Sequence, residues 1–116
     1  MLLYHGTNKN SKDKIQAEGF IPHQGEYGNC IYFAQSKDFA YDYGDEIIEV
    51  WIDSSHIKFI DVEFIDNNYI DVESFASENE YKAVGITYSS CKSVVNQTEI
   101  CVFDSSIIED INFNNI

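Results

Sequence analysis

The sequence predicts a single compact α+β domain over residues 1–116. Segments bounded by helix-capping residues come early in the chain, and short β-branched or aromatic segments follow them, which is the order typical of an α+β protein. A hydrophobic fraction of 44% and an aromatic fraction of 15% indicate a folded globular chain. A length of 116 residues allows one hydrophobic core and leaves too little chain for a second domain of ordinary size.

The chain opens with a short apolar segment and a capped polar one. Leu2-Leu3-Tyr4-His5 predicts a buried strand, and the glycine after it lets the backbone approach a ligand closely. A helix is expected over Lys12–Glu18, because Ser11 can cap its beginning and Gly19 can end it.

Glycines, a proline and a capping serine also mark the next three elements. Pro22–Asn29 contains two glycines and is expected to be a loop that lies over a pocket. Cys30–Phe33 predicts a short strand. Lys37–Tyr43 predicts a second helix, with Ser36 as its cap and Gly44 at its end.

The remaining chain is expected to be mostly β-structure. Glu46–Ile52 is the strongest strand, and Ile57–Ile60 is expected to be its partner after a polar turn. The acidic stretch Asp61–Asn79 favours helix in its second half. Further strands are expected at Ala83–Thr87, Glu99–Phe103 and Ile107–Ile111.

The charge balance is strongly acidic, with 20 acidic residues against seven lysines and a net charge of −13. Such a surface repels phosphate backbones, which argues against direct nucleic-acid binding. It suits a partner protein with a basic surface, or a decoy that imitates nucleic acid, and it also serves solubility. The chain has no arginine, so a mechanism that needs a guanidinium clamp on phosphates is excluded.

Several common kinds of site are absent from the sequence. There is no phosphate-binding loop, no Gly-x-Ser-x-Gly element, and no zinc spacing among the histidines and cysteines, so no metal is expected. Cys30, Cys91 and Cys101 follow no disulfide pattern and are expected to be reduced thiols. No apolar run approaches the roughly 20 residues of a membrane span, and no signal peptide is recognised, so a cytoplasmic protein is expected.

Three blocks of the sequence resemble the ADP-ribosyltransferases of the His-Tyr-Glu class, which includes poly(ADP-ribose) polymerases and diphtheria-type toxins. The first block is Leu3-Tyr4-His5-Gly6-Thr7, followed by Ile15 and Gly19-Phe20. The second is Tyr27-Gly28-Asn29-Cys30-Ile31-Tyr32-Phe33-Ala34, followed by a segment ending in Tyr43. The third is Asn96-Gln97-Thr98-Glu99-Ile100-Cys101-Val102-Phe103-Asp104. The chain departs from the class at Ala40, where many members have serine, and at Cys30, where glycine is usual.

The resemblance implies a split antiparallel sheet with short helices and a site for NAD. Glu99 would be the catalytic carboxylate, and Tyr32 and Tyr43 would hold the nicotinamide ring. Gly6 would offer its backbone to the carboxamide, and His5 would bind the adenosine ribose with Thr7 close by.

The resemblance further implies an enzyme that moves ADP-ribose from NAD to a protein and releases nicotinamide. Gln97, two residues before Glu99, would help to recognise the acceptor. The short chain favours mono-ADP-ribosylation, as in a bacterial or phage effector such as an anti-CRISPR protein. Two alternatives stay open: an acidic decoy or binding module that imitates nucleic acid, and an NAD glycohydrolase in which water is the acceptor.

Overall fold

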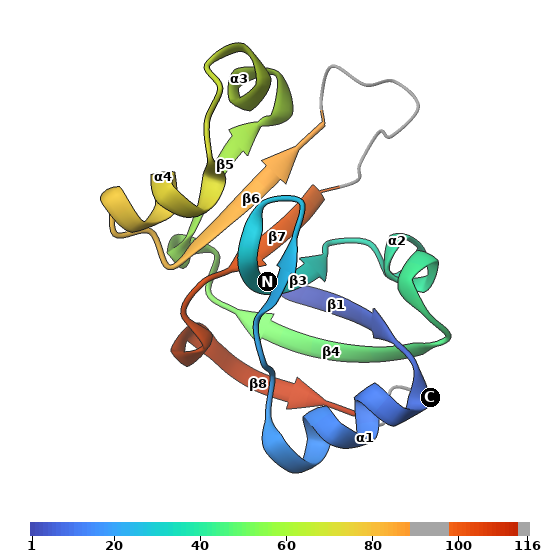
Figure 1. Ribbon diagram of the computed structural model, residues 1–116. Coiled ribbons are helices and arrows are strands. Elements are labelled where there is room, and N and C mark those ends of the chain that lie inside the picture. The colour runs from blue at the N-terminus through green and yellow to red at the C-terminus, as the bar shows by residue number, and fades with distance from the viewer. Residues whose placement is uncertain (89–97, 114–116) are drawn as a thin grey trace.

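The computed structural model describes residues 1–88 and 98–113, and its centre is an eight-stranded sheet (Figure 1). The strand order is β5-β6-β7-β3-β1-β4-β8, with β2 pairing β3 beside this path. All pairs are antiparallel apart from β5 and β6, which run parallel. The strands are β1 (Leu2–Thr7), β2 (His23–Gly25), β3 (Gly28–Ala34), β4 (Glu46–Ile52), β5 (Ile57–Asp61), β6 (Ala83–Thr87), β7 (Thr98–Val102) and β8 (Ile108–Asn112). The α-helices are α1 (Lys9–Glu18), α2 (Lys37–Ala40), α3 (Val62–Asn67) and α4 (Val72–Glu78).

The hydrophobic core lies on both faces of the sheet. Along β3, Ile31 and Phe33 belong to one cluster and Cys30 and Tyr32 to another, because successive side chains of a strand point to opposite faces. Ile15 of α1 packs on the first cluster, whereas α3 and α4 contribute buried side chains to the second. In Figure 1, α3 and α4 accordingly lie by β5 and β6, away from α1 and α2.

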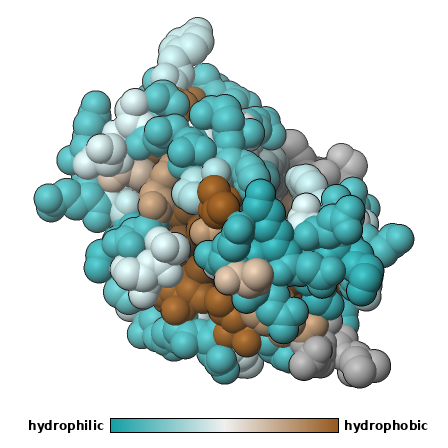
Figure 2. Space-filling view, turned by 60° about the horizontal axis from the view of Figure 1, so that its bottom comes forward, coloured by the Kyte–Doolittle hydropathy of each residue, from teal (hydrophilic) through white to brown (hydrophobic). Residues whose placement is uncertain are grey.

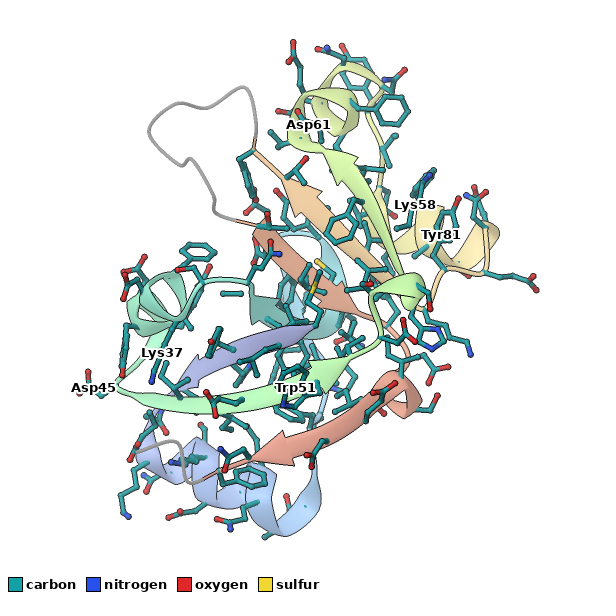
Figure 3. The ribbon with its side chains drawn as sticks, turned by 180° about the vertical axis from the view of Figure 1, so that it is seen from behind. Lys37, Asp45, Trp51, Lys58, Asp61 and Tyr81 are labelled. Atoms are coloured by element: carbon teal, nitrogen blue, oxygen red, sulfur yellow. The ribbon has the colours of Figure 1, made fainter. Side chains whose placement is uncertain are left out.

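The surface is mostly polar, with local apolar exposure. Figure 2 brings the side with α1 and β8 forward and shows a patch of hydrophobic residues surrounded by hydrophilic ones. Figure 3 shows the opposite view of the ribbon, with Trp51 on β4, Lys58 on β5 and Asp61 at the end of β5 beside α3. Within the described ranges, no helix has the length and apolar character needed to cross a membrane.

Most of the predicted elements in the first half are present, with shifted bounds. The first helix begins at Lys9 instead of Lys12, because Asn8 and not Ser11 caps it: the Asn8 side chain accepts a hydrogen bond from the Ser11 backbone at 2.8 Å. Gly19 ends the helix with φ 88°, as expected. The predicted loop Pro22–Asn29 is wrong in part, because β2 within it forms a hairpin with β3.

The predicted second helix is divided into two kinds of turn. Ser36 caps α2, as expected, and accepts a hydrogen bond from the Phe39 backbone. The helix tightens into a 3₁₀ turn at Tyr41–Tyr43 and ends at Gly44.

The expected pairing of Ile57–Ile60 with Glu46–Ile52 is wrong. Both edges of β4 are occupied, by β1 and by β8, so no edge remains for β5. Instead β5 pairs in parallel with β6, and α3 and α4 form the crossover between them. The acidic stretch therefore contains two short helices where the sequence favoured helix only in its second half.

Candidate functional site

The site is built where β1 and β3 stop pairing. Among the described residues, the register of these two strands consists of Tyr4 opposite Ala34, whereas β1 pairs with β4 along its whole length. Beyond Tyr4, the His5 ring bridges the two strands, with Nδ1 2.8 Å from the Tyr32 carbonyl oxygen. Cavities lie on both sides of this bridge, and His5 and Tyr32 line both of them.

The first cavity is small, mostly aromatic and closed by α2. It holds about 60 Å³, against the roughly 10–15 Å³ that one water occupies on the same measure. Its lining is Tyr4, His5, Gly6, Tyr32, Phe33, Ala34, Phe39, Ala40, Tyr43 and Glu99. Among the described residues of this lining, Glu99 is the one carboxylate, and it lies among aromatic and small side chains. Such a cavity suits a flat cationic ring.

Tyr32 is held firmly in place beside the first cavity. Its hydroxyl donates to the Gly28 carbonyl oxygen at 2.7 Å and accepts from the Tyr27 backbone at 3.0 Å. A Cβ added to Gly25 would lie 2.6 Å from the Tyr32 ring, so the hairpin backbone presses directly on it. Because these contacts fix the ring before any ligand arrives, little side-chain entropy is lost on binding.

Glu99 ends a chain of hydrogen bonds between tyrosines. Tyr88 donates to Oε2 of Glu99 at 3.4 Å, and the hydroxyl groups of Tyr27 and Tyr88 are 2.7 Å apart. Since Tyr88 gives its single proton to Glu99, Tyr27 donates to Tyr88. The chain orients the carboxylate through its Oε2 atom.

Burial raises the pKa of Glu99, the charge of Glu26 raises it further, and the Tyr88 hydrogen bond opposes both effects. The side chain is only 9% exposed. A carboxylate in such a partly desolvated site interacts strongly with a positive charge that forms beside it. A perturbed carboxyl in an aromatic cavity is a typical feature of a functional site.

His5 is neutral and offers an acceptor nitrogen. Burial lowers its pKa, against the opposing effect of the hydrogen bond to the Tyr32 backbone. A carbonyl oxygen only accepts, so Nδ1 carries the proton and Nε2 is left with a free lone pair. The ring is held edge-on by Phe20 and Phe33, at centroid distances of 5.3 and 5.7 Å. His5 is therefore suited to accept a hydrogen bond from a hydroxyl group.

The second cavity lies on the α1 side of the His5 bridge and is larger, at about 270 Å³. It is lined by His5, Thr7, Ser11, Lys14, Ile15, Gly19, Phe20, Ile21, His23, Ile31 and Tyr32. The two cavities share His5 and Tyr32 and therefore lie next to each other.

The structure brings most of the expected site residues together. Gly6, Tyr32, Tyr43 and Glu99 line the first cavity, and Thr7 lines the second together with His5. Tyr43 is 62% exposed, so it stands at the mouth of the first cavity. Gln97 lies outside the described residues.

Ala40 and Cys30, the two positions that depart from the class, have separate surroundings. Ala40 lines the first cavity and is buried over Gly6. Cys30 is fully buried beside the free thiol of Cys101, in the second core cluster. The cysteine change therefore alters the packing under the site and not the cavity wall.

Sequence reasoning missed Tyr88, which donates to Glu99, and Tyr27, whose hydroxyl is bonded to that of Tyr88. Ile86 is paired with Glu99 in the β6–β7 register, and Tyr88 follows two residues later, on the same face of the strand. Correct pairing of the two predicted strands would have identified Tyr88. Tyr27 was in the second sequence block, but only the hairpin of β2 and β3 turns its hydroxyl toward Tyr88.

No family model matches this chain, and no curated protein matches it in sequence.

Proposed function

We propose that this protein is a mono-ADP-ribosyltransferase that moves ADP-ribose from NAD to a protein acceptor. The observation that carries the proposal is the first cavity, where the buried Glu99 carboxylate lies with Tyr32 and Tyr43 around a small space next to Gly6. The order of the sequence blocks is a second, independent support.

The reaction breaks the bond between nicotinamide and the ribose carbon C1 and forms a bond from C1 to a nucleophile of the acceptor. Positive charge develops on the ribose as nicotinamide leaves with the bonding electrons, as in glycoside hydrolysis. Glu99 stabilises this charge, because its carboxylate is already oriented by Tyr88 and is shielded from water. The acceptor gives up its proton to solvent water as the new bond forms.

The aromatic cavity suits the nicotinamide ring, which is flat and cationic in NAD. Tyr32 and Tyr43 offer it electron-rich faces, and Glu99 offers it an opposite charge. His5, with Nε2 free, accepts a hydrogen bond from the hydroxyl of the adenosine ribose, and Thr7 lies in the same cavity. The lowered pKa of His5 keeps it in the neutral form that this hydrogen bond requires.

The acceptor is proposed to be a protein with a basic surface, because the enzyme carries a net charge of −13. Gln97 is proposed to take part in its recognition. We propose that this short acidic transferase is a bacterial or phage effector, such as an anti-CRISPR protein, and that it acts in the cytoplasm.

The test is to incubate the protein with NAD labelled in its adenosine half and with host-cell lysate. We expect a labelled protein band that is lost in Glu99→Ala, while the folded state of the variant, checked by circular dichroism, is retained. Label on a protein from the Glu99→Ala reaction would contradict the mechanism. Nicotinamide release without any labelled protein would identify an NAD glycohydrolase instead.

The decoy hypothesis makes the opposite prediction about surface acids. Asp61 and Asp71 accept hydrogen bonds from Thr87 and Ser74, and with Glu63 and Asp66 they belong to the region of α3 and α4. Replacing Glu63 and Asp66 by their amides should leave a transferase active, whereas a decoy should lose its effect. Glu99→Ala should inactivate a transferase and leave the effect of a decoy intact.

Tyr88→Phe is expected to move the acid limb of the pH profile of nicotinamide release to higher pH. The reaction requires the Glu99 carboxylate, whose pKa is raised above the ordinary 4.5, so the rate falls as pH decreases through that pKa. The Tyr88 hydrogen bond lowers this pKa, and its removal raises the pKa further. At pH values above this acid limb, the rate of nicotinamide release should fall several-fold, which corresponds to the loss of one hydrogen bond worth about 1 kcal/mol.

Tyr81→Phe is the matched control for this measurement. Tyr81 packs against Phe75, at a centroid distance of 5.6 Å, and does not line the first cavity. Its profile should match that of the wild type. An acid limb that is unchanged in Tyr88→Phe would show that Tyr88 does not act on Glu99.

A further inference from the structure

The second cavity has a lysine in its lining, in a protein that is strongly acidic. Among the described residues, those that line it include Lys14, His5 and His23 but no aspartate or glutamate. The chain has 20 acidic residues in 116, so this lining differs in charge from the chain as a whole. The first cavity, on the other side of the His5 bridge, has Glu99 as its charged group. The two cavities thus differ in charge, since Glu99 lines the first and Lys14 lines the second.

Lys14 is the group in the second cavity that can meet an anion. His5 is neutral and presents an acceptor nitrogen, so it suits a hydroxyl and not a phosphate oxygen. Lys14 is exposed on α1. The ion pair found among the described residues joins Lys12 to Glu46, at 3.6 Å, and does not involve Lys14. Since the chain has no arginine, a lysine must take any contact with phosphate that needs a full positive charge.

We propose that Lys14 binds the diphosphate group of a nucleotide in the second cavity, with Ser11 and His23 as neighbouring hydrogen-bonding groups. The flanking apolar side chains Ile15, Phe20 and Ile21 cover the nucleoside. That this nucleotide is the ADP half of NAD rests on the proposed function. The binding of a nucleoside diphosphate does not, because it requires neither Glu99 nor the first cavity.

The test is to measure binding of ADP and of adenosine to the full chain by isothermal titration calorimetry. ADP should bind more tightly than adenosine to the wild type, and Lys14→Gln should weaken ADP binding about tenfold, the size of one charge-assisted hydrogen bond. Adenosine binding should stay the same in that variant. The ADP affinity of the wild type should also fall with added salt, and this dependence should be smaller in Lys14→Gln.

Lys12→Gln is the matched control, because Lys12 lies on the same helix and does not line the cavity. Its ADP affinity should equal that of the wild type. Equal ADP affinity of Lys14→Gln and the wild type, or equal loss in both lysine variants, would overturn the proposal, as would a wild type that binds ADP no better than adenosine.

The outcome is separable from that of the labelling experiment. Lys14-dependent ADP binding in a protein that releases no nicotinamide would support this site and contradict the transferase. Transfer that is lost in Glu99→Ala, together with ADP binding that does not depend on Lys14, would support the transferase and contradict the Lys14 site.

Discussion

Glu99→Gln is expected to abolish nicotinamide release and at the same time to stabilise the fold at neutral pH. The loss of rate should be about 10²–10³-fold or more, because glutamine has the shape of glutamate but cannot stabilise the positive charge that forms on the ribose. The gain in stability has a separate cause. Burial and the charge of Glu26 raise the pKa of Glu99, so the ionised form is less favourable in the folded state than in the unfolded chain.

The sign of the pH dependence follows from linkage. Between the unfolded pKa and the higher folded pKa, the folded state binds more protons, so the free energy of unfolding falls as pH rises through this window. The penalty is complete above the folded pKa and absent below the unfolded one. Glutamine carries no charge, so the stability of Glu99→Gln should exceed that of the wild type near pH 7, and the difference should shrink as the pH is lowered.

Urea unfolding of both proteins between pH 4 and pH 8 measures this difference, with Glu63→Gln as the control. Glu63 is an exposed acid on α3, and its replacement changes the net charge by the same amount. Equal stabilisation by both variants would assign the effect to general charge repulsion and not to the buried site. A fully active Glu99→Gln would exclude Glu99 as the catalytic carboxylate.

Gly6→Ala is expected to cost both stability and activity. A Cβ at this position would lie 1.8 Å from the Ala40 carbonyl oxygen, which is backbone and cannot rotate away. Either α2 moves off β1 or β1 shifts, and overpacking of this kind costs about 1–3 kcal/mol. Because residues of both α2 and β1 line the first cavity, nicotinamide release should also fall strongly.

Gly19→Ala separates this steric effect from the effect of backbone conformation. Gly19 has φ 88° and ψ 174°, and a Cβ there would meet nothing within 4 Å, so its replacement costs only the strain of this backbone conformation, about 1–3 kcal/mol. Thermal unfolding and the rate of nicotinamide release should be measured for both variants. A Gly6→Ala protein with wild-type stability and rate would contradict the close packing of α2 on β1.

Local signals in the sequence were sufficient for most of the elements. Gly19 ends α1 because its φ is one that other residues rarely adopt, and Ser36 caps α2 because its side chain accepts a backbone hydrogen bond. The strand at Glu46–Ile52 was predicted with its observed bounds, since its β-branched residues lie between polar turns. These features depend on neighbours within a few residues, and such neighbours can be read from the sequence.

Pairing between strands was the part that local signals could not supply. Ile57–Ile60 was assigned to β4 because sequential strands often pair, but β1 and β8 compete for the two edges of β4 and occupy both. Which strands pair with β4 depends on how each pairing buries the apolar faces of the sheet, and that is a property of the complete core.

The sequence by itself determined the α+β class, most of the elements and the set of residues worth testing: His5, Gly6, Thr7, Tyr32, Tyr43 and Glu99. Only the tertiary structure decided that these residues meet at the place where β1 and β3 part, since they come from β1, β3, β7 and the 3₁₀ turn at Tyr41–Tyr43, which are separate segments of the chain. It also supplied Tyr88 and Lys14, which no motif indicated. The physical reason is that the pKa of a carboxyl and the charge of a cavity depend on burial and on neighbours in space, and these exist only once the sheet has formed.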